Sequence, residues 1–113
     1  MWPIEYYTTE DGHEPVREWL DSDEVGNRIK SNIEAKLEKL SENGLEVMLK
    51  TKMLERISGD DADLYELVGG QCRIVTHYDR RRGTFVLLHG FLKKGRTEPR
   101  HIEQARRRLR SYL

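Results

Sequence analysis

The segment Thr84–Lys94, with the sequence TFVLLHGFLKK, is the most apolar part of a chain in which 35% of the residues are charged. Between Thr84 and Leu92 the one ionisable side chain is His89. Glycines bound the segment, which is short for a helix and begins with β-branched and aromatic residues. It therefore predicts a central strand that is covered on both faces. Three cations leave this strand together at one edge of the sheet: Lys93, Lys94 and Arg96.

Length and composition limit the architecture. A chain of 113 residues with 36% hydrophobic content fits one domain, residues 1–113, with one modest core. We find neither a run of about 20 apolar residues, as a membrane helix needs, nor a secretory signal at the start. Cys72 is the single cysteine, so no internal disulfide forms, which favours a reducing cytosol and a cytoplasmic protein. The histidines show no zinc-site spacing, and we expect no metal and no cofactor.

The net charge of zero hides a strong asymmetry along the chain. Up to Cys72 there are 8 Lys and Arg against 17 Asp and Glu, a net charge of −9, and from Arg73 onward 12 against 3, a net charge of +9. Such separation indicates an anion-binding face. Mutual neutralisation of the two halves within the fold explains it equally well.

The N-terminal half predicts a strand and two helices. Trp2–Thr8 alternates apolar and polar residues as a strand does, and Pro15 opens a short helix that starts at His13 or Glu14 and ends at Asp21. Asp21 and Glu24 have capping-box spacing for a long amphipathic helix. Asn43 and Gly44 end that helix, whose outer face is solvated surface or the seat of a partner protein.

In the following segment, Leu45–Asp63, the apolar residues fit neither the helical nor the strand spacing. Its last part, Ser58–Asp63, is a polar loop. Lys50, Lys52 and Arg56 are the one basic cluster of the acidic half, and they form ordinary surface or a phosphate-contacting rim.

Leu64–Val68 and Gln71–Asp79 predict a hairpin around a Gly69-Gly70 turn. This register pairs Glu66 with Arg73 and places both on the polar face of the sheet. A further turn, Arg80–Gly83, leads into the central strand and pairs Asp79 with Thr84, so that Gly90 lies opposite Arg73. A one-residue bulge would place His89 there instead.

Pro99 then opens a last helix with a buried stripe that includes Ile102, Ala105 and Leu109.

This order of elements resembles that of the RelE superfamily. The residues that carry the resemblance are LYEL at Leu64–Leu67, Arg73 in the next strand, and LLHGFLKK at Leu87–Lys94 followed by Pro99. The similarity is closer to the phage-derived HigB-like toxins of type II toxin-antitoxin modules. It implies an α+β fold, with two N-terminal helices packed on a central antiparallel sheet of about four strands and a C-terminal helix beside it. It also implies a cytosolic endoribonuclease that cleaves messenger RNA, usually on the ribosome, and a helix-turn-helix antitoxin as partner.

Val68 departs from this resemblance, because the family commonly has arginine after the LYEL-like segment. Two alternative functions stay open. One is a catalytically weak module of the same fold that binds RNA or the antitoxin. The other is a toxin that acts on gyrase, as the related ParE proteins do.

RNA cleavage without metal needs cations around the phosphate and groups that handle protons. Arg73 can fork two donors onto a phosphate, with Glu66 orienting it or acting as base, although a simple cross-strand ion pair is also possible. We expect replacement of Arg73 by alanine to slow cleavage with little change in melting temperature. His89 is a core residue or a site residue, and Tyr112 packs in the core or reaches the site. The candidate catalytic residues are Arg73, Lys94, Lys93, Glu66 and His89. The candidate RNA-binding residues are Lys50, Lys52, Arg80, Arg81, Arg82, Arg96, Arg100 and Tyr112.

Overall fold

The computed structural model describes residues 1–57, 59 and 63–113 and has an α+β fold. Its elements follow the order β1 (Ile4–Tyr6), α1 (Pro15–Leu20), α2 (Gly26–Lys50), β2 (Leu54–Arg56), β3 (Leu64–Gly69), β4 (Cys72–Asp79), β5 (Thr84–Leu92) and α3 (Pro99–Tyr112). The predicted loop Ser58–Asp63 lies largely outside the described residues. Among the residues described, no helix combines the length and the apolar character that crossing a membrane requires.

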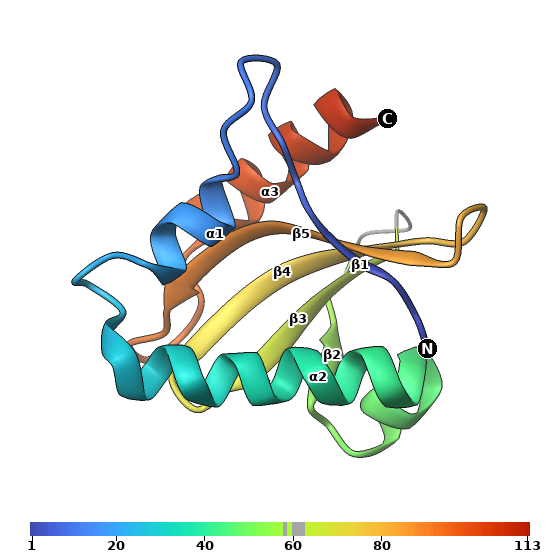
Figure 1. The fold of residues 1–113 in the computed structure, drawn as a ribbon, viewed down its shortest axis with the longest axis horizontal. Coiled ribbons are helices and arrows are strands. Elements are labelled where there is room, and N and C mark those ends of the chain that lie inside the picture. Colours follow the sequence, from blue (N-terminus) through green and yellow to red (C-terminus); the bar gives the residue numbers. More distant parts are fainter. Residues whose placement is uncertain (58, 60–62) are drawn as a thin grey trace.

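The described strands form a single mixed sheet in the order β1-β5-β4-β3-β2. The strand predicted over Thr84–Leu92 is confirmed as β5, and it lies inside the sheet between β1 and β4 (Figure 1). β1 runs parallel to β5, whereas the other neighbours are antiparallel. The expectation of about four antiparallel strands therefore needs correction. The fifth strand, β2, comes from the segment whose apolar residues fit neither period.

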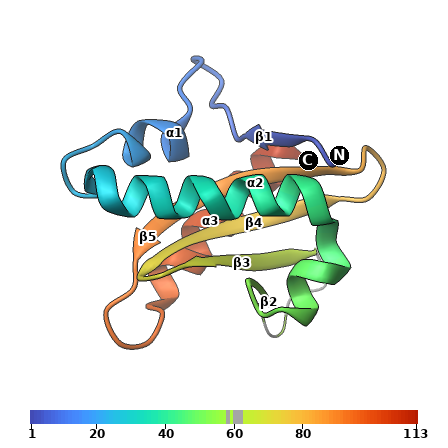
Figure 2. The same ribbon diagram turned by 60° about the horizontal axis from the view of Figure 1, so that its bottom comes forward.

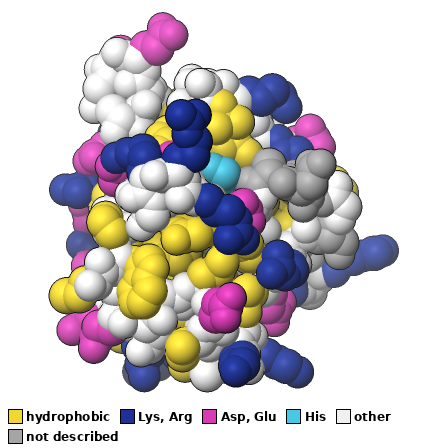
Figure 3. Space-filling model, turned by 90° about the vertical axis from the view of Figure 1, so that its right-hand side faces the viewer, with side chains coloured by type: hydrophobic (Ala, Val, Ile, Leu, Met, Phe, Trp, Pro, Cys, Tyr) yellow, Lys and Arg dark blue, Asp and Glu magenta, His cyan; other side chains and the backbone are white. Residues whose placement is uncertain are grey.

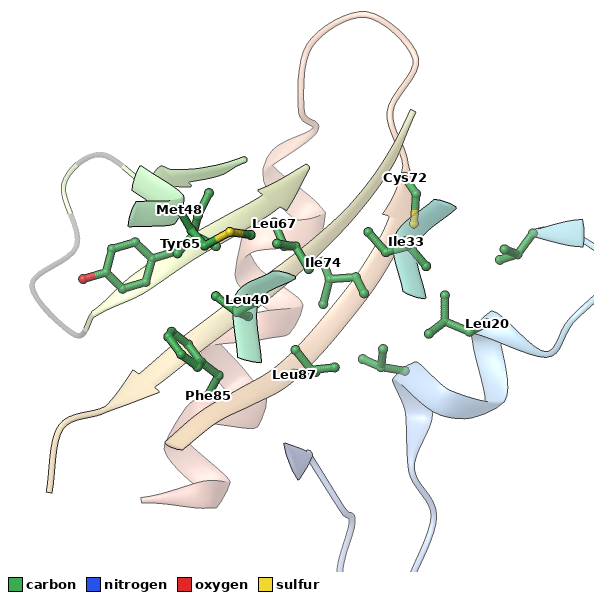
Figure 4. Close-up of a cluster of buried hydrophobic side chains, with 13 residues drawn as sticks. Leu20, Ile33, Leu40, Met48, Tyr65, Leu67, Cys72, Ile74, Phe85 and Leu87 are labelled. Carbon is green, nitrogen blue, oxygen red and sulfur yellow. The ribbon is translucent and has the colours of Figure 1, made fainter. Parts of the chain in front are cut away.

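Helices cover both faces of the sheet. α1 packs against β1 and β5, and α2 packs across β2, β3 and β4, on the same face (Figures 1 and 2). α3, which was expected beside the sheet, covers the opposite face along β4 and β5. Each face therefore has its own buried cluster. The α2 face includes Ile33, Tyr65, Leu67, Ile74 and Phe85 (Figure 4), and the α3 face includes Val75, Val86, Leu88, Ala105 and Leu109.

The long helix differs from its prediction at both ends. It begins at Gly26 without a side-chain cap, so the predicted capping box is wrong, and Asp21 instead ends α1 and pairs with Lys30. Gly44 does not end the helix but kinks it, with φ of 80°. Its missing side chain also makes room for Trp2, because a Cβ there would lie 2.7 Å from the Trp2 ring.

The β3–β4 hairpin keeps the predicted faces but not the predicted pairs. Val68 lies opposite Arg73 and Glu66 opposite Val75, so the turn consists of Gly70 and Gln71. Of the two glycines in this hairpin, only Gly70 has a positive φ, of 62°. Gly69 remains in the strand, where a Cβ would lie 2.6 Å from Ile33 on α2. The two glycines thus serve different purposes, and the register moves by two residues, which leaves Glu66 and Arg73 on one face.

A bulge in β5 changes the next register. Asp79 pairs with Thr84 as predicted, but Thr76 pairs with Leu87 and Val75 with His89, which leaves Leu88 as the extra residue. Phe91 therefore lies opposite Arg73, and neither Gly90 nor His89 does. Both predicted alternatives were wrong, because the extra residue lies on β5 before His89.

Candidate functional site

The end of the sheet where β5 leaves for α3 gathers many of the side chains that the sequence singled out. The backbone N–H of Lys93, directly after β5, donates to the carbonyl oxygen of Gln71 in the β3–β4 turn, at 2.7 Å. The turn, the exit of β5 and the start of α3 meet at this end (Figure 2). A buried ion pair and an open cleft flank the junction.

Glu66 and Arg73 form the buried ion pair. Arg73 Nε lies 3.2 Å from Glu66 Oε1, and the two side chains are 14% and 11% exposed. The Arg73 Nη1 group donates to the carbonyl oxygens of Gly70 and Cys72. Burial raises the pKa of Glu66, while the charges of Lys93 and Arg73 oppose this shift. Arg73 is thus tied to the turn and to Glu66.

The two lysines after β5 lie on different sides of the strand. Lys93 is close enough to Glu66 to lower its pKa, whereas Lys94 lines the cleft. The register predicted from the sequence put Lys94 on the side of Gly90, and both residues do line the cleft. That register also put Gly90 opposite Arg73, which is wrong, because the bulge places Phe91 there.

The cleft lies beside the part of β5 that β1 leaves uncovered, since β1 pairs only with Phe85–Leu87. Its volume is about 640 Å³, and residues of α1, β5 and the start of α3 line it. Two cations, Lys94 and Arg100, belong to this lining together with His89 and His101. The cleft therefore brings together three predicted site residues and one histidine that was not predicted.

His89 and His101 form a hydrogen-bonded pair, with 2.8 Å between His89 Nε2 and His101 Nδ1. Arg108 Nη1 donates to the Leu88 carbonyl at 2.7 Å and faces His89 Nδ1 at 3.4 Å. Because a guanidinium can only donate, His89 Nδ1 accepts and His89 Nε2 carries the proton. His89 therefore donates to His101 Nδ1, and the His101 proton is on Nε2.

Both imidazoles are held neutral. Burial, followed by the charge of Arg108, lowers the pKa of His89 to about 4. Burial and the charge of Arg100 also lower the pKa of His101. At neutral pH the cleft thus has a neutral N–H donor and two cations among its lining residues, a combination that suits an anionic ligand.

His101 is the residue that the sequence analysis missed. Two features pointed to it: its place in the first turn of a helix opened by Pro99, and its position after the apolar strand. Its contact with His89 depends on how α3 packs on β5, with the Phe91 and His101 rings stacked at 4.1 Å between centroids. The sequence does not specify that packing. The position of His89 lies between the two that were expected, since its side chain is partly buried and also lines the cleft.

Four predicted RNA-binding residues lie at the other end of the sheet. The turn Arg80–Gly83 is separated from Arg73 by most of β4, since the six residue steps from Arg73 to Asp79 span about 20 Å. Arg80 pairs with Asp63 at 2.8 Å, and Arg82 pairs with Glu5. Tyr112 accepts from Arg82 and donates to Asp79. Arg80–Arg82 and Tyr112 therefore do not form one surface with Arg73, and Figure 3, from that side, shows basic and acidic side chains interspersed.

The remaining predicted cations are exposed. Lys50 and Lys52 flank the end of α2, and Arg96 lies in the loop before α3. Arg100 pairs with Glu98 at 3.0 Å beside the cleft. Within residues 1–57, 59 and 63–113, no three His, Cys, Asp or Glu side chains gather where they could hold a metal ion.

Comparison with known proteins gives one family. The model described as "Phage derived protein Gp49-like (DUF891)" matches residues 18–110, which include every cleft-lining residue. This family is associated with RelE-like toxins of toxin-antitoxin systems. No curated protein matches the chain.

Proposed function

The chain belongs to the family of phage-derived Gp49-like proteins, and on that premise we propose that it is the toxin of a toxin-antitoxin module that cleaves messenger RNA on the ribosome. The observation that carries this proposal is the neutral His89–His101 pair in a cleft with Lys94 and Arg100. The partner that we expect is a helix-turn-helix antitoxin.

In the proposed reaction the RNA supplies its own nucleophile. A 2′-oxygen attacks the adjacent phosphorus, the bond to the 5′-oxygen breaks, and the products carry a 2′,3′-cyclic phosphate and a 5′-hydroxyl. The 2′-hydroxyl proton leaves to solvent hydroxide, and the 5′-oxygen takes a proton from water. Lys94 and Arg100 neutralise the phosphorane, and His101 Nε2–H donates to one of its oxygens. Arg73, Glu66 and Lys93 hold the exit of β5 in place.

A binding module without catalysis is the second candidate function. It is favoured by Val68, where the family that the chain resembles commonly has arginine, and by the hydrogen bonds of Arg73 to backbone carbonyls. A gyrase-directed toxin is the third. Three measurements on the purified chain distinguish these candidates: cleavage of message, binding of RNA and inhibition of DNA supercoiling.

The test is incubation of the purified chain with programmed ribosomes, followed by mapping of cuts in the message. We expect cleavage of ribosome-bound message, and a rate lower by about 10² to 10³ in Lys94→Ala, the scale for losing one transition-state donor. Arg107→Ala, which removes an exposed cation of the same helix that carries His101, should leave the rate unchanged. An intact message would contradict the proposal. RNA binding alone would then indicate the binding module, and inhibited supercoiling the gyrase-directed toxin.

A further inference from the structure

We propose that Trp19 is the platform on which one nucleobase of single-stranded RNA stacks when its phosphate lies at Lys94 and Arg100. This inference rests on the proposed function, because it assigns a base-binding wall to the same cleft. It concerns how the RNA is held and not how it is cut.

Trp19 reaches the cleft through the gap beside β5. It belongs to α1, which packs on the opposite face of the sheet from α3. Because β1 pairs with β5 no further than Leu87, the following residues of β5 have no strand on that side among the described residues. Trp19 and His101 therefore line one cleft from opposite faces of the sheet.

Gly90 lets the ring of Trp19 approach β5 closely. A Cβ at Gly90 would lie 2.5 Å from both Cε3 and Cζ3 of Trp19. The backbone does not itself require glycine there, since Gly90 is not among the glycines with positive φ. Trp19 Nε1 also donates to Glu24 Oε2 at 3.0 Å. The close approach to Gly90 and the hydrogen bond to Glu24 thus hold the ring in place, as a pre-organised stacking surface requires.

The rest of the cleft fits a nucleotide better than a peptide. Its volume of about 640 Å³ lies within the roughly 300–1,000 Å³ of small-molecule sites. Its aromatic walls are Trp19 and the stacked Phe91–His101 rings. Of its two carboxylates, Glu24 is bound to Trp19 and Glu98 to Arg100. Aromatic faces with adjacent cations are the recurring means of holding single-stranded nucleic acid.

The experiment measures binding of a short single-stranded RNA in which every nucleotide carries a 2′-O-methyl group, so that it cannot be cut. With Trp2→Phe as background, Trp19 is the one fluorophore of its kind, and we expect the RNA to quench it. Trp19→Leu keeps apolar bulk but lacks a π-face, and should weaken binding about 5- to 150-fold, the effect of losing one stacked base. Trp19→Phe should bind within about threefold of the parent.

Salt dependence distinguishes stacking from a merely structural effect. Trp19→Leu should leave the slope of log K against log salt unchanged, because it removes no phosphate contact. Arg100→Ala should lower that slope by about 0.7, the value for one phosphate on a single strand. A Trp19→Leu protein that changes the slope as Arg100→Ala does would overturn the inference.

Gly90→Ala provides a second, independent variant. It should displace the ring and weaken binding in the parent, but have little further effect in Trp19→Leu, since the two residues act as a unit. Unchanged affinity in folded Trp19→Leu would overturn the inference, and so would additive effects of the two changes. The probe cannot be cut, so it tests binding separately from cleavage. Quenching of Trp19 fluorescence without cleavage of message would refute the proposed function but not the stacking role of Trp19.

Discussion

Replacing His101 with alanine is expected to lower the rate of message cleavage by about 10² to 10³, because the phosphorane loses one hydrogen-bond donor. His101→Gln, whose amide can donate from a similar position, should recover part of the loss. Arg107 lies on the same helix, and Arg107→Ala should leave the cleavage rate unchanged. The measurement is single-turnover cleavage on programmed ribosomes, with melting temperatures recorded for each variant to exclude unfolding.

The pH dependence of this rate follows from the lowered pKa values of both imidazoles. Since burial and the charge of Arg100 lower the pKa of His101, its neutral form predominates at neutral and alkaline pH. It then donates equally well across that range, and the rate should rise continuously with hydroxide concentration. A plateau at high pH above an inflection that is absent in His101→Ala would instead make His101 the base and contradict this role.

Replacing Arg73 with methionine is expected to destabilise the fold by about 3–5 kcal/mol, the cost of leaving the buried charge of Glu66 without its partner. This differs from the small change in melting temperature that the sequence suggested. The reason is that both side chains are more than four-fifths buried and that Arg73 also binds the β3–β4 turn. Urea unfolding measures the change, and the control is again Arg107→Ala.

The loss of stability in Arg73→Met should grow as the pH rises. Burial already raises the pKa of Glu66 in the folded protein, and Arg73 opposes that shift, so removing Arg73 raises it further. A carboxyl whose folded pKa exceeds its unfolded pKa gives full stability below about 4.5 and loses stability as pH rises through the folded pKa. The free energy of unfolding of Arg73→Met should therefore be lowest near pH 8. Adding Glu66→Gln should restore stability at that pH. Equal losses at pH 5 and pH 8 without rescue would contradict the account.

The elements with a strong period or a clear punctuating residue were predictable. β5, α1 and α3 follow from an apolar run, from Pro15 and from Pro99. The registers were not, because Gly69 is required by the approach of Ile33 and not by the turn. The bulge at Leu88 likewise depends on how β5 packs against neighbours far away in the sequence.

The candidate site was predictable by residue type more than by arrangement. The sequence pointed to the exit of β5, and the structure places His89, Lys94 and Arg100 around one cleft there. The ion pair between Glu66 and Arg73 was one of the alternatives that the sequence left open, but its burial could not be predicted. The pairing of Arg82 with Glu5 at the other end of the sheet could not be predicted either. The sequence analysis also missed His101, whose role depends on its contact with His89. In each case the decisive contact joins elements that the sequence alone does not place.

The chemical nature of the cut ends tests the central claim most directly. Message cleaved by the purified chain should be analysed for its new termini, with EDTA present and with the ribosomes kept intact by other means. Attack by the 2′-oxygen predicts a 2′,3′-cyclic phosphate on the upstream fragment and a 5′-hydroxyl on the downstream one. It also predicts a rate that survives the chelator. A 3′-hydroxyl with a 5′-phosphate, or activity abolished by EDTA on intact ribosomes, would contradict the account.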